Sequence, residues 1–296
     1  MLKVFFGVAR VNFLTLTLVC IAMAAVLSWY ELEQLSLRSV VLVVILALAA
    51  HISVNAFNEY FDFKSGLDFL TEKTPFSGGS GTLIHNPERA GYALAIALTS
   101  LLVVLVLGLG FVFQQGWQLL WIGVPGVLII YAYTQYINRL PLFCLLAPGV
   151  GFGLLMTLGA SWVFTGYLTP AAWVLASIVT LLVSNLLLLN QFPDVEADKK
   201  VGRRHYPILI GRLASAWIFV AFLVLSYCLL IAAYFFGWLP LQALLGLLSL
   251  FLAIPLMNKV VKQANNIPHL IPALGMNVAL CHLYPLGIVA GLLWAA

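Results

Sequence analysis

Two short polar stretches interrupt a chain that is 63% hydrophobic and only 8% charged. The first reads Asn-Glu-Tyr-Phe-Asp at residues 58–62, and the second reads Asn-Gln-Phe-Pro-Asp at residues 190–194. In each stretch the asparagine and the aspartate are four positions apart, a spacing that places both side chains on one face of a helix. Each stretch is followed by another aspartate, Asp68 or Asp198, and by basic residues. The repetition predicts two related clusters of oxygen ligands that face one another across a shared site.

Four aspartates gathered in one place would repel one another strongly. At about 4 Å, two like charges cost on the order of 4 kcal/mol at an effective dielectric constant of about 20. A divalent cation removes this repulsion, and Mg²⁺ typically binds oxygen ligands through few carboxylates together with substrate phosphates. We therefore expect a Mg²⁺–diphosphate site whose catalytic residues and metal ligands are Asp62, Asp68, Asp194 and Asp198.

Basic side chains beside the aspartates are suited to bind phosphate oxygens. The nearby candidates are Lys64, Lys73, Lys199, Lys200, Arg203 and Arg204. A diphosphate held at the mouth of an apolar helical cavity implies a substrate with an apolar tail, and prenyl diphosphates have this form. Metal and basic residues would stabilise the leaving diphosphate while the protein excludes water from the allylic carbocation. An electron-rich acceptor would then attack that carbocation.

The rest of the chain predicts an all-α integral membrane protein. It has 296 residues and a mean hydropathy of +1.07, and runs of about 20 apolar residues are typical of membrane-spanning helices. Gly66 predicts a helix end between Asp62 and Asp68, and Pro193 is expected to kink the sixth span or to end it early. We expect one domain over residues 1–296, with paired motif regions at 55–90 and 187–212. The nine expected spans are roughly 8–29, 39–62, 91–113, 117–137, 141–164, 170–192, 213–236, 240–258 and 270–294.

The charges predict the orientation of these spans. With the N-terminus in the cytoplasm and the C-terminus outside, every one of the 14 Lys and Arg residues except Arg38 falls on the cytoplasmic side. The small net charge of +4 therefore indicates orientation and anionic partners, not nucleic acid. No acidic residue lies in the middle of a span, which argues against an ion path through the bilayer.

Simpler interpretations exist for several of these residues. An acidic cluster at a helix end is often a solvated cap, and Tyr131, Tyr133 and Tyr136 fit an interfacial aromatic belt. Residues 77–81 (Ser-Gly-Gly-Ser-Gly) have the composition of a flexible loop. The four cysteines stand alone in apolar segments, so we expect them to be small core or lipid-facing residues. The five histidines show no ligand spacing and are assigned no role.

The two motifs resemble those of the UbiA superfamily of intramembrane prenyltransferases. The resemblance lies in NEYFDFKSGLD (58–68) and NQFPDVEADKKVGRRHYPILIGR (190–212), and with the nine-span plan it covers nearly the whole chain. It implies a ring of nine helices around a central cavity and Mg²⁺-dependent transfer of a prenyl group from a polyprenyl diphosphate to an aromatic or related acceptor. By position, it implies substrate-binding roles for Asn58, Asn190, Lys64, Lys73, Tyr131, Arg139, Arg203 and Arg204.

The details are most similar to the menaquinone branch, which prenylates 1,4-dihydroxy-2-naphthoate. The chain departs from that branch at residues 77–81, after the fourth span, and at Tyr206-Pro207. The acceptor therefore stays open among 4-hydroxybenzoate, homogentisate, chlorophyllide, haem and glyceryl phosphate types, and the oligomeric state is not determined. A divalent-cation or lipid transporter is the alternative from another class, while a CDP-alcohol phosphotransferase lacks its D-G-x-x-A-R stretch. We expect a multi-pass protein among the lipids of a bacterial or archaeal cytoplasmic membrane.

Overall fold

The computed structural model describes residues 1–71, 74 and 79–296, and its secondary structure there is entirely helical. Nine helical segments of the described chain are long and apolar enough to cross a membrane, which confirms the predicted count. The segments are α2 (Leu14–Leu32), α3 (Leu37–Ser65), α5 (Ala90–Gln115), α6 (Leu120–Gln135), α7 (Pro141–Val150) with the π-helix η6 (Gly151–Thr157) and α8 (Leu158–Thr165), α9 (Pro170–Lys200), α11 (Arg212–Phe235), η7 (Leu241–Ser249) with α12 (Leu250–Gln263), and α13 (Ile267–Ala295).

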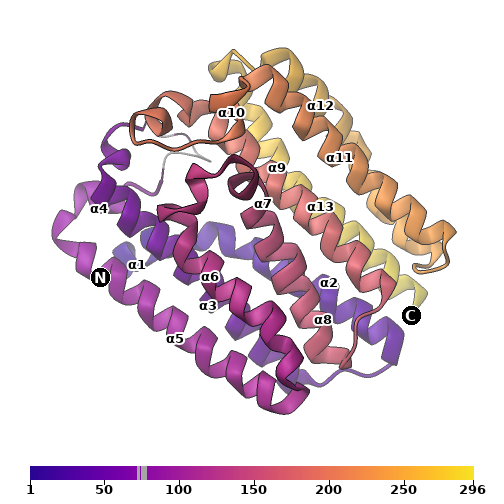
Figure 1. Cartoon of the computed structure of the whole chain (residues 1–296). Coiled ribbons are helices and arrows are strands. Elements are labelled where there is room, and N and C mark those ends of the chain that lie inside the picture. Colours follow the sequence, from indigo (N-terminus) through magenta and orange to yellow (C-terminus); the bar gives the residue numbers. More distant parts are fainter. Residues whose placement is uncertain (72–73, 75–78) are drawn as a thin grey trace.

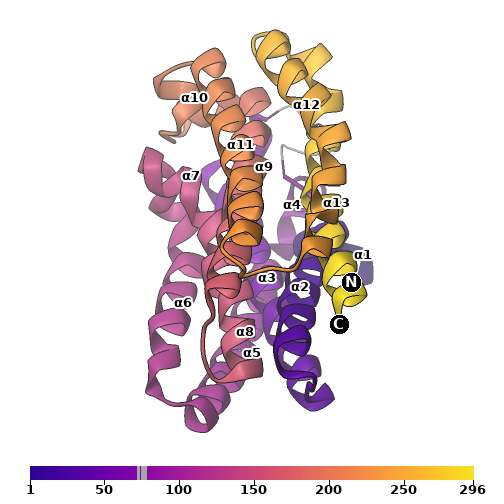
Figure 2. The same ribbon diagram turned by 90° about the vertical axis from the view of Figure 1, so that its right-hand side faces the viewer.

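Short helices connect these spans. They are α1 (Leu2–Ala9), α4 (Thr82–His85), α10 (Tyr206–Leu209) and the 3₁₀ turns η1 (Val11–Phe13), η2 (Leu67–Phe69), η3 (Pro87–Arg89), η4 (Trp117–Leu119) and η5 (Ile137–Arg139). The long helices run side by side in Figure 2, with α10 at one end of the molecule. Every described lysine and arginine except Arg38 lies in a segment at the end that carries both aspartate motifs.

The first expected span, 8–29, is wrong at its start. The chain breaks at Arg10, whose φ of 49° lies in the left-handed region, and the separate helix α1 precedes the break. A left-handed residue cannot continue a right-handed helix. The break therefore sets a basic side chain beside the first motif, as described below.

The sixth expected span, 170–192, is wrong at its end. Helix α9 continues through Pro193 to Lys200, although an interior proline removes a backbone hydrogen bond and clashes with a carbonyl. Packing of this deeply buried helix against its neighbours offsets that cost. Asp194 and Asp198 therefore lie one turn apart on the same helix. By contrast, α3 ends at Ser65 as predicted, and Gly66 adopts a φ of 78° as its left-handed cap.

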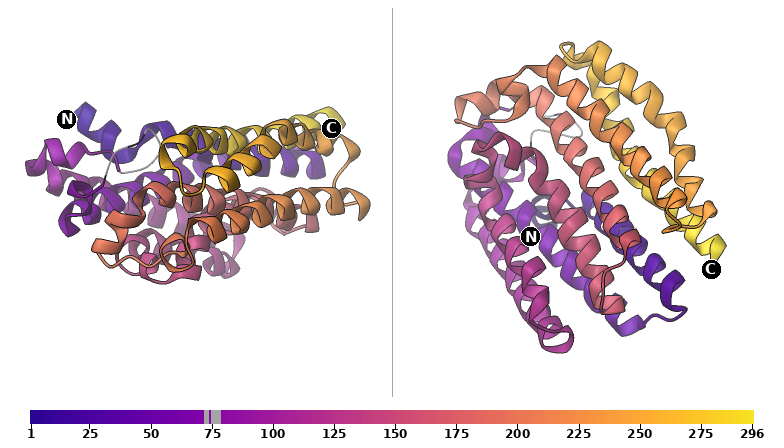
Figure 3. Two further views of the ribbon diagram at one scale, coloured as in Figure 1. Left: turned by 90° about the horizontal axis from the view of Figure 1, so that it is seen from above. Right: turned by 45° about the vertical axis from the view of Figure 1, so that its right-hand side comes forward.

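Helix α9 is the most deeply buried of the spans and divides the molecule into two parts. On one side lie α2, α3, α5, α6, α7 and α8, which wall a cavity together with α9. On the other side α11 packs against α9, α13 packs against α9 and α2, and η7 and α12 pack against α11 and α13. Figures 1 and 3 show α12 and α13 on the side of the bundle opposite to α5 and α6. The described residues that line the cavity run from Phe6 of α1 to His205, which follows α9.

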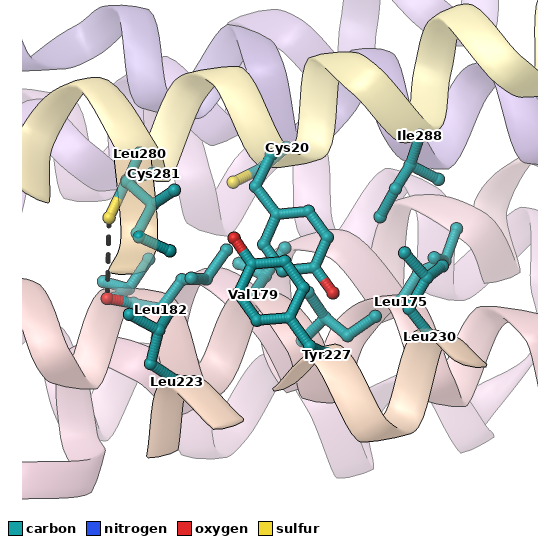
Figure 4. Close-up of a cluster of buried hydrophobic side chains, with 14 of the residues drawn as sticks. Cys20, Leu175, Val179, Leu182, Leu223, Tyr227, Leu230, Leu280, Cys281 and Ile288 are labelled. Atoms are coloured by element: carbon teal, nitrogen blue, oxygen red, sulfur yellow. Dashed lines mark hydrogen bonds between the residues drawn. The ribbon is translucent and has the colours of Figure 1, made fainter. Parts of the chain in front are cut away.

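The part without the cavity is a closely packed core. Figure 4 shows side chains of α9, α11 and α13 meeting there, among them Leu182, Leu223 and Ile288. The rings of Tyr227 and Tyr284 stack with centroids 4.4 Å apart, and their hydroxyl groups bond to Ser249 and to the Ser226 carbonyl. The four cysteines are free, three of them buried and Cys228 exposed, as predicted.

Close backbone approach joins the cavity wall to α9. A Cβ added to Gly149 would lie 2.1 Å from the Thr180 carbonyl oxygen, and one added to Gly153 would lie 2.2 Å from the Ala176 carbonyl oxygen. Only glycine permits this contact, and small residues at helix interfaces are a principal means of association in membranes, where lipid tails remove the hydrophobic driving force. The π-helix η6 begins between these two contacts.

We predict that Gly153→Ala lowers the free energy of unfolding by about 1–3 kcal/mol, because the added methyl group overpacks a contact with the α9 backbone. The measurement is the thermal unfolding midpoint of the purified protein in detergent. Gly110→Ala is the matched control, since a Cβ at Gly110 meets nothing within 4 Å. Equal midpoints for the two variants would show that this contact is not tight.

Candidate active site at the aspartate motifs

A cavity of about 1250 Å³ runs through the first six spans. Along α3 its lining extends from Asp62 to Val43, a distance of roughly 28 Å at 1.5 Å per residue. This length is close to the thickness of the hydrocarbon core of a bilayer, about 30 Å. Both motifs lie at one end, and apolar residues such as Phe111, Leu119 and Val163 line the other end. The cavity therefore joins a charged mouth to an apolar interior.

Arg203 connects the two motifs. Its Nη2 donates a hydrogen bond to Asp62 of the first motif, and its Nη1 donates to Asp198 Oδ1 in the second motif region at 3.0 Å. Burial opposes the charge of this guanidinium, but the carboxylates of Asp62 and Asp198 outweigh burial and raise the pKa of Arg203 above its usual value. The side-chain amide of Asn58 donates to Asp62 Oδ2 at 3.0 Å, as the four-residue spacing predicts.

The segment after the second motif contains a histidine for which the sequence predicts no role. His205 is buried, and its Nε2 lies 3.0 Å from Asp198 Oδ2, so Asp198 is held by both Arg203 and His205. Asn190 and Asp194 line the cavity beside them. The Asn190 Oδ1 atom is buried and has no hydrogen-bond partner among the described atoms. The sequence did contain a signal for this role, because His205 directly follows the two arginines after the motif.

Asp68 follows α3 in the turn η2 and also lines the cavity. Its Oδ2 atom is buried without a hydrogen-bond partner in the described part of the chain. Burial, together with the negative charges of Glu59 and Asp62, raises the pKa of Asp68 from 3.8 to about 7. This carboxyl group therefore lies where a cation would be strongly favoured.

Glu59 and Arg10 form a second charged contact that the sequence analysis did not identify. Glu59 is fully buried, and it accepts hydrogen bonds from Arg10 at 3.3 Å and from the backbone and side chain of Ser80. Arg10 also donates to Asn58 Oδ1 at 2.8 Å and lines the cavity. The contact ties the break after α1 to the end of α3 and to the segment before α4. The sequence signal for this contact was Arg10 itself, a basic residue inside the first expected apolar span.

Four of the expected substrate-binding residues lie outside the cavity wall. Lys64 is exposed, with its Nζ 5.8 Å from the centre of the Tyr60 ring, and Tyr131 packs edge-on against Phe57 and Phe61. Arg139 and Arg204 are exposed. Lys73 lies outside the described residues. Tyr133, which the sequence placed in an aromatic belt, does line the cavity.

The donor set at the cavity mouth suits a hard divalent cation. It consists of carboxylate and amide oxygens, and two of its buried oxygen atoms, Asp68 Oδ2 and Asn190 Oδ1, have no hydrogen-bond partner. Mg²⁺ and Ca²⁺ prefer such ligands. Within the described residues no three His, Cys, Asp or Glu side chains are already gathered closely enough to hold a metal ion. The guanidinium group of Arg203 lies between Asp62 and Asp198 instead.

Comparison with known proteins places this architecture among prenyltransferases. The sequence model of the UbiA prenyltransferase family matches residues 13–267. A 1,4-dihydroxy-2-naphthoate octaprenyltransferase of Bacillus subtilis is 27% identical over 229 residues, which are 76% of this chain and 71% of the relative. A digeranylgeranylglyceryl phosphate synthase of Methanobrevibacter smithii is 24% identical over 222 residues, 72% of this chain and 75% of the relative.

Solved structures share the fold. The apo structure of a UbiA homolog from Aeropyrum pernix K1 has a TM-score of 0.72 at 18% identity, covering 94% of this chain and 97% of that one. A UbiA homolog from Archaeoglobus fulgidus bound to DMAPP and Mg²⁺ has a TM-score of 0.62 at 13% identity, covering 96% of this chain and 98% of that one. The fold of nine membrane-spanning segments is therefore shared with proteins of low sequence identity.

The raised pKa of Asp68 predicts a pH dependence of stability in EDTA. Because the folded protein holds this proton more tightly than the unfolded chain, the contribution of Asp68 to stability is complete below about pH 4 and is lost as the pH rises through about 7. In the wild type this ionisation lowers the free energy of unfolding by up to about 4 kcal/mol. We expect Asp68→Asn, which has no proton to lose, to abolish that decrease. As the pH rises from about 4 to about 7, the thermal unfolding midpoint of the wild type should therefore fall more than that of Asp68→Asn. A difference between the two proteins that does not change with pH would contradict this prediction.

Proposed function

Because the chain belongs to the UbiA prenyltransferase family, we propose that it transfers a prenyl group from a polyprenyl diphosphate to an aromatic acceptor in the presence of Mg²⁺. The proposed acceptor is 1,4-dihydroxy-2-naphthoate or a related quinone precursor. The observation that carries the proposal is the meeting of both aspartate motifs at the charged mouth of an apolar cavity about as long as the bilayer core is thick. An amphiphile with a diphosphate head and a hydrocarbon tail matches this division.

The metal ligands in this proposal are Asp62, Asp68, Asp194 and Asp198, with Asn58 and Asn190 beside them. All of them line the cavity mouth. Bound there, Mg²⁺ would neutralise the diphosphate and stabilise it as a leaving group. The unpartnered Asp68 Oδ2 and Asn190 Oδ1 atoms support this assignment. The Mg²⁺ and DMAPP that accompany the Archaeoglobus homolog support it as well.

The residues of the chain supply three further functions. Arg203 and Arg10, both on the cavity wall, are placed to donate hydrogen bonds to diphosphate oxygens. Asn58 holds Asp62, and His205 holds Asp198, so both carboxylates keep a defined orientation. The apolar walls below the motifs exclude water, which would otherwise trap an allylic carbocation. Lys64, Lys73, Tyr131, Arg139 and Arg204 stay as weaker candidates for contacts at the mouth.

The proposed acceptor rests on the relatives and on the motif spacing. The Bacillus relative carries the name of a dihydroxynaphthoate prenyltransferase, whereas the Methanobrevibacter relative carries that of a glyceryl phosphate prenyltransferase. The two acceptors differ physically, since one is a flat ring with hydroxyl and carboxyl groups and the other is a lipid phosphate. The same cavity mouth serves either reaction, and a direct assay separates them.

The test is diphosphate release and product formation by the purified protein with Mg²⁺ and geranylgeranyl diphosphate. The acceptors are 1,4-dihydroxy-2-naphthoate, 4-hydroxybenzoate and geranylgeranylglyceryl phosphate, each alone. We expect release that depends on the dihydroxynaphthoate and is lost with EDTA. Release with the lipid phosphate alone would reject the aromatic acceptor. Binding of Mg²⁺ and flux of ions into liposomes without any release would support the transporter alternative.

We predict that Asp62→Asn and Asp194→Asn each lower kcat by at least about a hundredfold, because each removes a negative charge from the proposed metal site. The matched control is Glu88→Gln, which neutralises an exposed acid at the same end of the molecule and should keep normal turnover. Circular dichroism and thermal unfolding identify variants that have lost their fold. Normal turnover in either aspartate variant would reject the metal assignment.

We predict that the apolar part of the cavity limits the length of the prenyl tail that the protein accepts. A Cβ at Gly126 on α6 would meet only Leu155 of the cavity wall, at 4.0 Å. Gly126→Leu therefore adds volume to the interior without a backbone clash. We expect it to lower kcat/KM for geranylgeranyl diphosphate by about tenfold relative to dimethylallyl diphosphate. Gly110→Leu, on α5 but not on the cavity wall, is the control, and the same ratio in both variants would contradict the assignment.

A further inference from the structure

His51 lies in the cavity wall deep within the membrane-spanning part of α3. It precedes Asn58 by seven residues, or two helical turns, so both side chains share one face and lie roughly 10 Å apart along the helix axis. Only 6% of His51 is exposed, and the residue lines the cavity. A polar ring inside a membrane segment is costly and generally has a function. The mechanism proposed above gives it none.

Two neighbouring elements fix the orientation of this ring. Its Nδ1 lies 2.8 Å from the hydroxyl group of Thr17, a fully buried residue of α2. The ring of Phe152 packs edge-on against it, with centroids 4.8 Å apart and planes at 88°. Phe152 belongs to the π-helix η6, which approaches the α9 backbone closely at Gly153. The imidazole is therefore held in one plane by α2 and η6.

The second ring nitrogen of His51 is open to the cavity. Nε2 makes no hydrogen bond within the described chain, and it keeps some exposed surface. An unpaired polar atom that loses contact with water is energetically unfavourable. A hydrocarbon tail lying against Nε2 would impose this cost, whereas a ligand with a hydroxyl group would remove it.

His51 also marks the inner limit of the polar part of the cavity. Towards the mouth, α3 presents Asn55, Asn58 and Asp62 to the lining, and towards the interior it presents Ala47 and Val43. Beyond His51, this wall therefore offers only apolar surface for the tail. The section of this wall between His51 and Asn58 is roughly two helical turns, or about 10 Å, long, which is comparable to the span of a substituted bicyclic aromatic ring.

We propose that His51 Nε2 binds a ring hydroxyl group of an aromatic acceptor, and that Thr17 is the positioning residue that aims it. A hydroxyl group both donates and accepts, so it pairs with Nε2 in either neutral tautomer of the ring. The inference rests on the proposed prenyl transfer, and it names a hydroxylated aromatic ring as the acceptor class. The phosphate of a glyceryl phosphate acceptor would find its partners at the charged mouth and would need no polar group at this depth.

The test is equilibrium binding of 1,4-dihydroxy-2-naphthoate to the full-length protein in detergent, without prenyl diphosphate or metal. Binding is followed by quenching of tryptophan fluorescence. We expect His51→Leu to raise the dissociation constant at least about tenfold, and Thr17→Val to raise it about threefold, because the ring loses its orientation. His51→Gln, which keeps a donor and an acceptor, should restore most of the affinity. Thr165→Val, which removes a threonine hydroxyl group on α8 away from the cavity wall, should leave the constant unaltered.

Steady-state kinetics separate this role from a structural one. In active variants, KM for the dihydroxynaphthoate should rise while KM for geranylgeranyl diphosphate stays within about twofold, and the thermal midpoint should stay near that of the wild type. If His51→Leu does not fold, His51→Gln and Thr17→Val carry the same comparison. An unchanged dissociation constant in the Thr17 and His51 variants overturns the inference, as does a wild type that does not bind the aromatic acceptor. Failure of prenyl transfer with every acceptor would instead overturn the proposed function, since the binding measurement does not depend on turnover.

Discussion

The charge balance between Arg203 and the aspartates at the cavity mouth constrains most of the structure. Buried carboxylates are stable only when a cation or several hydrogen-bond donors accompany them, and removal of one partner of such a pair typically costs about 3–5 kcal/mol. Arg203 meets this requirement by contacting Asp62 of α3 and Asp198 of α9. Its position depends on the end of α3 at Gly66, on the extension of α9 to Lys200, and on the turn that follows. The features that close the ends of these two helices therefore also form the site.

The same requirement explains why the first motif has a cation of its own. Glu59 is fully buried beside Asp62 and Asp68, and Arg10 reaches it from the break before α2. The left-handed backbone at Arg10 therefore directs this side chain toward Glu59, whereas a continuous first helix would direct it away from Glu59. With Arg10 and Arg203, each motif is accompanied by a guanidinium group. Both groups are suited to phosphate oxygens because they are always charged and offer several donors.

Helix α9 links the site to the rest of the bundle. One of its faces carries the second motif and part of the cavity wall, and the other packs against α11 and α13. Lipid tails are as apolar as the side chains, so this packing depends on close contact and not on the exclusion of water. Gly149 of α7 and Gly153 of η6 approach the backbone of α9 closely, and α11 and α13, which are joined by their buried aromatic pair, also pack against α9. The cavity can therefore stay open on one side while α9 is held from the other.

Much of this protein was determined by local features of the sequence. The nine spans follow from the length and hydropathy of each apolar run, and the helix end at Gly66 and the pairing of Asn58 with Asp62 follow from glycine and from helical spacing. Three contacts were decided by the tertiary structure alone. Arg203 bonds to Asp62, which is 141 positions away, Arg10 bonds to Glu59, and His51 bonds to Thr17. The tertiary structure also places Lys64 and Arg139 outside the cavity wall. Hydropathy and spacing depend only on neighbours along the chain, whereas these contacts depend on how helices pack and rotate against one another, which no local pattern records.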